Sequence, residues 1–225
     1  STQWFLDLQR ELPGDLLFVV GYQGTKSTQL YRGRNINNGG PHPTIIESQR
    51  RVRRLWNNVT LREAGANSNY NALVAKVEKR FSKGLAFVSS YTWSHTIDQN
   101  DESLDENLSG NANPYDFTAE RGNASLDRRH NFLTSVTYEL PFRFSSGVLR
   151  AALGGWQLGG ILSFRTGFPF DVSYPGDPQN SGTRSRGNRI ATGTLDRPTI
   201  DRWFDESAFV QSAPGVFGNT GRNVL

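Results

Sequence analysis

Hydrophobic and polar residues alternate along two neighbouring stretches that run from Tyr70 to Ile97. In both stretches one parity is apolar, and these positions are Leu73, Ala75, Val77, Phe81, Leu85, Phe87, Tyr91 and Trp93. Because successive side chains of a strand point to opposite faces, the pattern predicts a hairpin around Ser82-Lys83-Gly84. Each arm holds roughly 12 residues, whereas ordinary strands hold about 5–6 and a tilted strand that crosses a bilayer needs about 9–11.

The same alternation recurs in four other stretches. Residues 3–9 and 16–23 form a second predicted hairpin around Leu12-Pro13-Gly14-Asp15, since proline and glycine fix turn angles. Residues 131–140 and 156–165 are the last two predicted strands. We therefore expect an all-β chain with about six long antiparallel strands in up-and-down order.

Short and long connections alternate along the chain. Short turns are expected near residues 13–14, 83–84 and 147, and long loops at about 25–67, 98–127 and 174–225. This asymmetry is typical of an outer-membrane β-barrel, in which short turns face the periplasm and long loops are extracellular. We predict that residues 1–225 form such a transmembrane β-barrel segment. A soluble β-sandwich that uses the same aromatic residues as its core is the alternative.

Aromatic residues fall near both ends of the predicted strands, as in the two girdles of a membrane barrel. The expected lipid-facing girdle residues are Tyr22, Phe81, Tyr91, Trp93, Phe132, Tyr138, Trp156 and Phe164. In the central hairpin, Leu73, Val77 and Phe87 share the lipid-facing parity. Lys76, Glu78 and Ser90 have the other parity and are expected to face the lumen.

Composition removes several classes of protein. No run approaches the roughly 18 consecutive apolar residues of a membrane helix, which excludes a helical membrane protein. The absence of cysteine excludes disulfide scaffolds, zinc–thiolate sites and cysteine nucleophiles. The net charge of +4 is modest and spread along the chain, so we expect no nucleic-acid partner. The chain contains no Met, even at its start, and is interpreted as an internal piece of a longer product.

Potential catalytic groups do not form a recognisable constellation. Ser94 and His95 are adjacent on a predicted strand, so their side chains point to opposite faces. No G-x-S-x-G sequence surrounds the serine, and no pair of histidines has metal-ligand spacing. We predict that the chain is not an enzyme and has no cofactor.

The expected outer loops carry two kinds of charged cluster. The acidic residues Asp98, Asp101, Glu102, Asp105 and Glu106 are candidates for a hard cation, although they lack the order of an EF-hand loop and also fit a solvated loop. The candidate ligand residues are Arg50, Arg51, Arg53, Arg54, Arg184, Arg186, Arg189 and Trp203. The arginines either meet lipopolysaccharide phosphates or an anionic ligand, or are ordinary solvated charge.

Five phrases, in this order, resemble TonB-dependent receptors. They are QWFLDLQRELPGDLLFVVGYQGTKSTQL, NSNYNALVAKVEKRFSKGLAFVSSYTWSHTID, FTAERGNASLDRRHNFLTSVTYELPF, LGGWQLGGILSFRTGFPF and GVFGNTGRNVL. The subgroup they resemble is the Oar-like proteins with an N-terminal carboxypeptidase-regulatory-like domain, which are frequent in Acidobacteria. The resemblance covers nearly the whole chain. It implies the late part of a plugged barrel of about 22 strands, energised from the inner membrane through TonB.

The sequence departs from that pattern in three respects. The plug domain, the TonB box and the final strands are absent from these 225 residues, so we expect an incomplete barrel. Six strands are also fewer than the about eight of the smallest closed membrane barrels. The implied partners are outer-membrane lipid and lipopolysaccharide, the rest of the barrel and its plug, the TonB system and an unknown solute.

The expected function is therefore to supply wall and substrate-facing outer loops to a TonB-dependent receptor-like transporter. Its expected location is the outer membrane of a Gram-negative bacterium. One alternative is a structural or adhesive role at the cell surface for the same kind of barrel. Another is a soluble β-rich carbohydrate-binding module, in which exposed Trp and Tyr stack on sugars.

Overall fold

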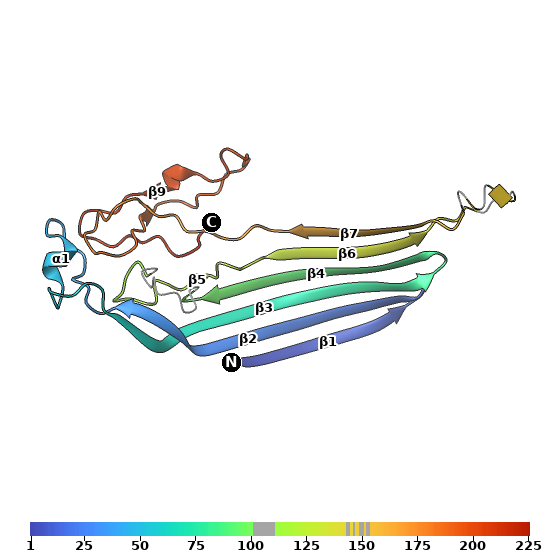
Figure 1. The fold of residues 1–225 in the computed structure, drawn as a ribbon, viewed down its shortest axis with the longest axis horizontal. Coiled ribbons are helices and arrows are strands. Elements are labelled where there is room, and N and C mark those ends of the chain that lie inside the picture. The colour runs from blue at the N-terminus through green and yellow to red at the C-terminus, as the bar shows by residue number, and fades with distance from the viewer. Residues whose placement is uncertain (101–110, 143–144, 146, 149–150, 152–153) are drawn as a thin grey trace.

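The computed structural model is built around one antiparallel sheet (Figure 1). It describes the chain except residues 101–110, 143–144, 146, 149–150 and 152–153. In spatial order the long strands are β1 (Thr2–Leu12), β2 (Leu16–Asn35), β3 (Thr60–Ser82), β4 (Leu85–Asp98), β6 (His130–Glu139) and β7 (Gln157–Arg165), with β5 (Gly122–Asn123) paired to the end of β4. Four short elements lie outside this sheet. A helical turn, α1 (Glu47–Arg50), lies between β2 and β3, and β8 (Asn188–Arg189), η1 (Glu206–Ala208) and β9 (Phe209–Val210) come after β7. The prediction of an all-β, antiparallel, up-and-down sheet is confirmed.

Tight turns join the first four strands in two hairpins. Lys83 and Gly84 have φ angles of 53° and 80°, and Gly14 and Asp15 have φ angles of 87° and 60°. The β3–β4 connection has two residues, and positive φ at both of them matches the right-handed twist of the strands that it connects. The β1–β2 connection is the three-residue loop Pro13-Gly14-Asp15 between the paired residues Leu12 and Leu16. Both turns therefore lie where the sequence predicted them.

The strand register gives the sheet two chemically different faces. Tyr22, Leu73 and Trp93 are directly opposite one another on β2, β3 and β4. Tyr91, Phe132 and Phe164 form a second such row on β4, β6 and β7. Because directly opposed residues of an antiparallel pair lie on the same side of a sheet, both rows belong to one face. We call it the apolar face and the other the polar face.

β2 and β3 are longer than the sequence predicted. They hold 20 and 23 residues, and their pairing continues to Asn35 and Thr60. The predicted loop at about 25–67 is therefore only residues 36–59 within this hairpin, and the earlier boundaries are wrong. Apolar alternation stops near Gln23, but backbone pairing continues through an irregularity between Ser27 and Tyr31, where a bulge bends the pair.

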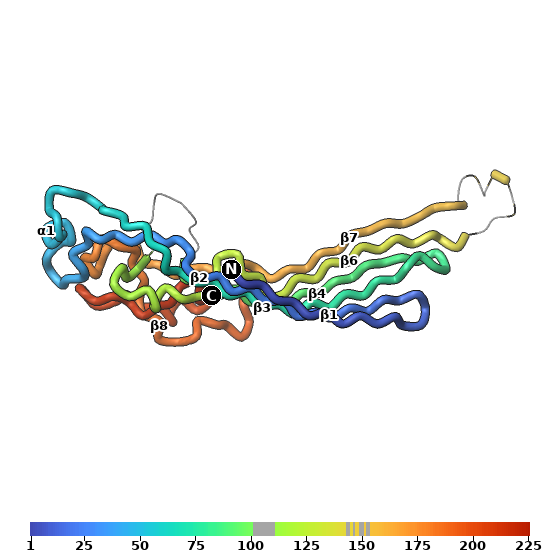
Figure 2. Tube along the Cα trace, turned by 90° about the horizontal axis from the view of Figure 1, so that it is seen from below, coloured from blue at the N-terminus to red at the C-terminus, as the bar shows by residue number. Residues whose placement is uncertain are grey.

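The long connections and the C-terminal segment gather at the end of the sheet opposite the tight turns (Figures 1 and 2). We call residues 36–59, 111–129 and 166–225 the cap, and the six long strands the wall. Most buried polar side chains lie in the cap, including Asn37, Asn38, Glu120, Gln179, Ser181, Arg186, Arg222 and Asn223. In the wall the buried apolar residues are only the small Ala66 and Ala72 among the residues described. The protein thus has a polar core, and that core is in the cap.

The sheet does not close on itself. In the described part of the chain, β1 pairs only with β2, and β7 only with β6, at opposite edges. The expectation of an incomplete barrel is confirmed in this sense. No helix among the described residues combines the length and the apolar character needed to cross a membrane.

Candidate functional site in the polar cap

The predicted girdle residues lie along the apolar face or at the ends of its strands. Tyr22, Tyr91, Trp93, Phe132, Tyr138 and Phe164 share that face by register, whereas Phe81 lies at the turn end of β3 and Trp156 directly precedes β7. Trp93 is 56% exposed and Phe164 is 60% exposed. Exposure of large aromatic residues on a single sheet argues against the soluble sandwich, whose second sheet would cover them.

The polar face carries the residues expected in the lumen. Lys76 and Ser90 are direct cross-strand partners, and Lys76 Nζ lies 2.9 Å from Glu78 Oε2. Phe5 and Ile161, which are 80% and 78% exposed, are apolar exceptions on the two edge strands by their register. The lysine therefore pairs with a neighbouring carboxylate on its own strand.

A buried charge network joins the segments of the cap. Arg186 is 2% exposed, and its Nη1 lies 2.9 Å from Glu120 Oε2 while its Nη2 lies 3.4 Å from Asp171 Oδ2. Arg184 Nη1 lies 3.1 Å from the same Asp171 oxygen. The second carboxylate oxygen of Glu120 accepts a hydrogen bond of 2.8 Å from the backbone N–H of Ala112. From the sequence, Arg186 was either a ligand for an anion or ordinary solvated charge, and the structure instead makes it a buried partner of two carboxylates.

A second buried pair ties the C-terminal segment to the wall. Arg222 Nη2 contacts the carboxylate of Asp98, the last residue of β4, and Arg222 Nε donates to the backbone carbonyl of Glu120 at 3.1 Å. Burial lowers the pKa of Arg222 to about 10, because desolvation disfavours its charged form. By strand parity Asp98 lies on the polar face with Ser90, so the contact with Arg222 joins the cap to the polar side of the sheet.

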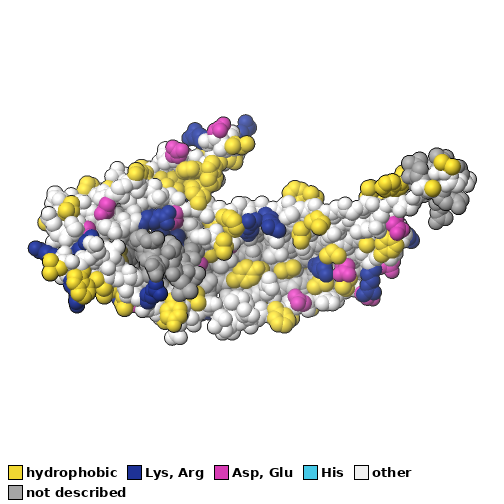
Figure 3. Space-filling view, viewed as in Figure 1, with side chains coloured by type: hydrophobic (Ala, Val, Ile, Leu, Met, Phe, Trp, Pro, Cys, Tyr) yellow, Lys and Arg dark blue, Asp and Glu magenta, His cyan; other side chains and the backbone are white. Residues whose placement is uncertain are grey.

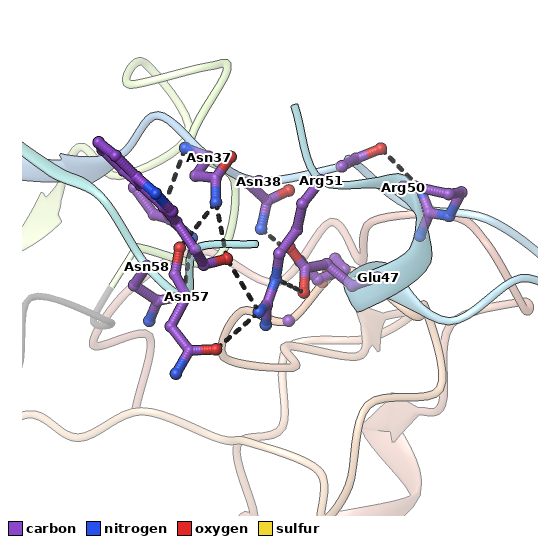
Figure 4. Close-up of polar contacts among 12 residues, drawn as sticks. Asn37, Asn38, Glu47, Arg50, Arg51, Asn57 and Asn58 are labelled. Carbon is purple, nitrogen blue, oxygen red and sulfur yellow. Dashed lines mark hydrogen bonds and ion pairs between the residues drawn. The ribbon is translucent and has the colours of Figure 1, made fainter. Parts of the chain in front are cut away.

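The predicted arginine cluster at 50–54 lies in a hydrogen-bonded loop at the far end of the cap (Figure 4). Arg50 donates to the backbone carbonyls of Gly39, Ile45 and Asn180. Arg51 Nε lies 2.8 Å from Glu47 Oε2.

Asn37 stabilises the same loop, because its Nδ2 donates to the carbonyls of Arg53, Trp56 and Asn57 at 2.7–3.1 Å. The guanidinium of Arg53 also lies 5.4 Å from the Trp56 ring. Arg50, Arg51 and Arg53 thus have intramolecular partners, and Arg54 is exposed.

The remaining ligand candidates lie on the lobe around β8 and β9, which projects beyond β7 (Figure 1). Arg189 donates to the carbonyls of Ala191 and Thr192. Trp203 is 50% exposed, and its ring centroid is 4.4 Å from that of Phe170. Figure 3 shows apolar side chains gathered on this lobe. Trp203 therefore belongs to an aromatic cluster that is open to solvent on one side.

A cavity of about 300 Å³ lies beside the buried charge network. Its lining is mostly polar and comes from the two residues directly after β4 and from two of the three cap segments, 111–129 and 166–225: Gln99, Asn100, Asn111, Glu120, Ser125, Pro169, Phe170, Asp171, Arg184, Arg186, Arg222 and Asn223. Arg184 and Arg186 are thus brought together, whereas Arg189 and the 50–54 cluster do not line this cavity. Charged and amide groups here can bind a small polar solute by hydrogen bonds.

Neither Asp98, the described member of the acidic run considered for cation binding, nor the Ser94–His95 pair lines this cavity. Among the predicted cation ligands, Asp98 pairs with Arg222, whereas Asp101, Glu102, Asp105 and Glu106 lie outside the described residues. The part of the chain that is described contains no cluster of three or more His, Asp or Glu with metal-binding geometry. His95 Nε2 lies 2.7 Å from Arg129 Nη2, and Ser94 Oγ donates to the backbone carbonyl of Arg128.

Only half of the charged members of these buried pairs, Asp98, Arg184 and Arg186, were candidates from the sequence. Glu120, Arg222 and Asn223 lie in two of the phrases that resemble TonB-dependent receptors, and this was the available signal for them. Asp171 and Asn37 carried no signal of periodicity or spacing. Their partners are distant in the chain, as Arg222 is from Asp98, 124 residues away.

Comparison with known proteins gives one positive finding. A family model described as outer membrane beta barrel domain matches residues 1–225. Searches of the curated proteins and of the solved structures returned no significant match. Because the family model spans the whole sequence, and because the open sheet has the strand layout of such a barrel, the chain belongs to the outer membrane beta barrel domain family, and its place is the outer membrane of a Gram-negative bacterium.

Proposed function

We propose that the chain forms wall and substrate-facing outer loops of a TonB-dependent receptor-like transporter. The observation that carries the proposal is the attachment of a polar cap to the polar side of an open sheet, through Asp98 and Arg222. In a membrane barrel the polar side faces the lumen, so a cap on that side stands at the outer mouth of the pore. The five phrases that resemble TonB-dependent receptors support the assignment of the barrel to that class of transporter.

The open edges support a longer barrel as the functional unit. β1 and β7 each leave one row of backbone groups without a partner among the described residues. Unpaired backbone groups cost several kcal/mol each in lipid, so a spanning sheet must close. The proposed partners at both edges are the remaining strands of the same barrel, and the proposed partner inside it is a plug that contacts TonB.

Solute recognition is assigned to the cap. Its cavity of about 300 Å³ offers guanidinium, carboxylate and amide groups at the lumen side, which suit a small polar solute. We propose no catalytic residues and no nucleic-acid partner. Ser94 and His95 have opposite strand parity, and each contacts backbone or neighbouring side chains rather than each other.

A structural or adhesive role at the cell surface is the second candidate function. The observation that favours it is the projecting lobe, where Trp203 is half exposed beside Phe170. Exposed aromatic rings of this kind suit stacking against a sugar or a neighbouring surface. The soluble carbohydrate-binding module is no longer an alternative, because the family is one of the outer membrane.

The proposal is tested with the intact protein encoded by the gene, purified from outer membranes in detergent. We expect it to bind the periplasmic domain of TonB from the same bacterium, measured by biolayer interferometry. Deletion of the gene's proposed TonB box should abolish that binding and leave the folded barrel intact. An intact barrel that shows no affinity for TonB would instead favour the structural or adhesive role.

A further inference from the structure

Large apolar side chains stand exposed at the end of the cap that lies farthest from the tight turns. Residues 51–56, which we call the tip, follow α1 at that end (Figures 1 and 2). Val52, Leu55 and Trp56 are 74%, 98% and 55% exposed. Single exposed apolar residues are ordinary, but several within one short turn form a patch, and patches of this kind mark interaction sites.

Buried polar groups fix the backbone of the tip. Asn37 is 2% exposed, and its Nδ2 donates to three backbone carbonyls in and next to the tip at 2.7–3.1 Å. Its Oδ1 accepts the backbone N–H of Arg53 at 2.7 Å. Arg51 Nη1 donates to Asn57 Oδ1 at 2.9 Å (Figure 4). Because a turn held in this way has little conformational entropy to lose when a partner arrives, the tip is organised for binding in advance.

The tip is also basic. Arg53 and Arg54 are exposed, and neither pairs with a carboxylate among the described residues. The guanidinium of Arg53 lies 5.4 Å from the Trp56 ring. The acid closest in sequence, Glu47, is buried and already paired with an arginine. Together, α1 and the tip hold four arginines and one acid, and four positive charges less one negative charge leave +3.

We propose that the tip docks on an acidic surface of another protein outside the cell. Leu55 and Trp56 are the apolar anchors, and Arg53 and Arg54 face the carboxylates of the partner. Tryptophan and arginine are enriched at the energetic centres of protein interfaces, and opposite charge speeds the encounter and selects the partner. The proposal rests on the proposed extracellular position of the cap and does not depend on the transport role.

This partner differs from the lipopolysaccharide phosphates that the sequence suggested for these arginines. Arg50 is occupied by three backbone carbonyls and Arg51 by a carboxylate, so only two arginines of the cluster face outward. Phosphates offer charge but no surface that covers Leu55 and Trp56, whereas a protein surface offers both. The tip also lies at the opposite end of the cap from the wall, and therefore away from the lipid around the wall (Figure 2).

The test begins with the intact protein, labelled in detergent and offered to yeast cells that display random peptides. Cells that bind the wild type are kept, and cells that also bind the double variant Arg54→Gln/Leu55→Ser are discarded. The peptides that remain should be rich in Asp and Glu and should carry Leu, Phe or Trp. Failure to obtain such peptides, or selection of basic or uncharged ones, would overturn the proposal.

The most frequent peptide is then synthesised, labelled and titrated by fluorescence anisotropy. Leu55→Ser should weaken its binding about tenfold, and Arg54→Gln about threefold, with the second effect fading at high salt. Ile200→Ser is the matched control, because Ile200 is also 98% exposed but lies on the lobe of β8 and β9, and it should leave binding unchanged. Equal effects of Leu55→Ser and Ile200→Ser would contradict docking at the tip.

Two further measurements separate a prepared protein surface from a general anion site. Asn37→Ala changes no outward side chain, yet it should weaken peptide binding because it frees the turn, and unchanged binding would contradict a surface organised in advance. Purified lipopolysaccharide should not displace the peptide, and displacement would overturn the assignment to a protein partner. TonB binding by all of these variants should be unchanged, so failure of the tip is distinguishable from failure of the proposed transport role.

Discussion

The wall and the cap are stabilised in opposite ways: the wall by backbone hydrogen bonds between long strands, and the cap by buried polar side chains. In the wall, backbone groups pair along long ladders, and the apolar face leaves residues such as Trp93 and Phe164 exposed. In the cap, regular structure is limited to short elements, yet polar side chains such as Arg186 and Asn37 are almost fully buried. The wall needs no core of its own because the membrane covers its apolar face.

Because only the wall has long strands, different interactions stabilise the wall and the cap. Wall strands are fixed by register, as in the 11 consecutive residue pairs between β1 and β2. The cap lacks such ladders, so side chains satisfy its backbone groups, as Asn37 does for three carbonyls. Buried polar networks are costly when one member is removed, because the remaining members lose both water and their partner. The cap should therefore be sensitive to single polar substitutions that the wall tolerates.

The largest expected effect is the loss of Arg186. Arg186→Met leaves the carboxylates of Glu120 and Asp171 without their shared partner, at a cost of about 3–5 kcal/mol. Hydrogen exchange on the protein in lipid should show faster exchange in residues 111–129 and 166–225, with β3 and β4 unchanged. Arg202→Met is the control, because Arg202 is 68% exposed and its pair with Asp205 spans 3.4 Å. Equal loss of protection in wall and cap would show that the two regions unfold as one unit.

A charge on the apolar face should break the wall and spare the cap network. Phe87→Arg places a guanidinium on the face that carries Tyr91 and Trp93, three residues from the tight turn. The expected cost lies between the about 2–4 kcal/mol of mid-bilayer and the about 0–1 kcal/mol of the interface. Membrane assembly, measured by the heat-modifiable mobility of the barrel, should fall. Ser90→Arg, on the polar face of the same strand, should assemble normally. Equal tolerance at both positions would contradict the assignment of the faces.

The wall was predictable from the sequence and the cap was not, for a physical reason. Strand parity is local, so Leu73 and Trp93 could be placed on one face from alternation alone. Cap contacts join residues far apart in the chain: Arg186 and Glu120 are separated by 66 positions, and Asn223 and Asn123 by 100. No local period encodes such pairs. The boundaries of β2 and β3 were missed for a related reason, because backbone pairing continues where side-chain alternation has stopped.

A smaller effect is expected from one neutral side chain of the cap. Asn37→Ala removes three hydrogen bonds to backbone carbonyls and the acceptor for the N–H of Arg53, at about 1–3 kcal/mol. Limited proteolysis should then cut within residues 44–59 more rapidly. Asn57→Ala in the same loop is the control, because Asn57 is exposed and its side chain accepts one bond from Arg51. Its effect should stay within about 0.5 kcal/mol, and equal effects of the two variants would argue against a supporting role for Asn37.

The smallest expected effect concerns the exposed rim of the cap and depends on pH. Asp205 precedes η1, and its carboxylate accepts hydrogen bonds from Ser207 Oγ at 2.8 Å and Ser207 N at 3.2 Å. These bonds, led by that from the Ser207 hydroxyl, lower the pKa of Asp205 below its usual 3.8. Because the folded pKa is depressed, the stabilisation is complete above the unfolded pKa and is lost as pH falls through the folded pKa.

Protection of the Ser207 and Ala208 amides, corrected for intrinsic exchange, should therefore decline below about pH 4. Asp205→Asn keeps a side-chain oxygen that can accept these bonds but does not titrate, so its protection should not change with pH over that range. Asp196→Asn removes a carboxylate from the same lobe and should leave the decline in place. If the decline persisted in Asp205→Asn, the titrating group would lie elsewhere.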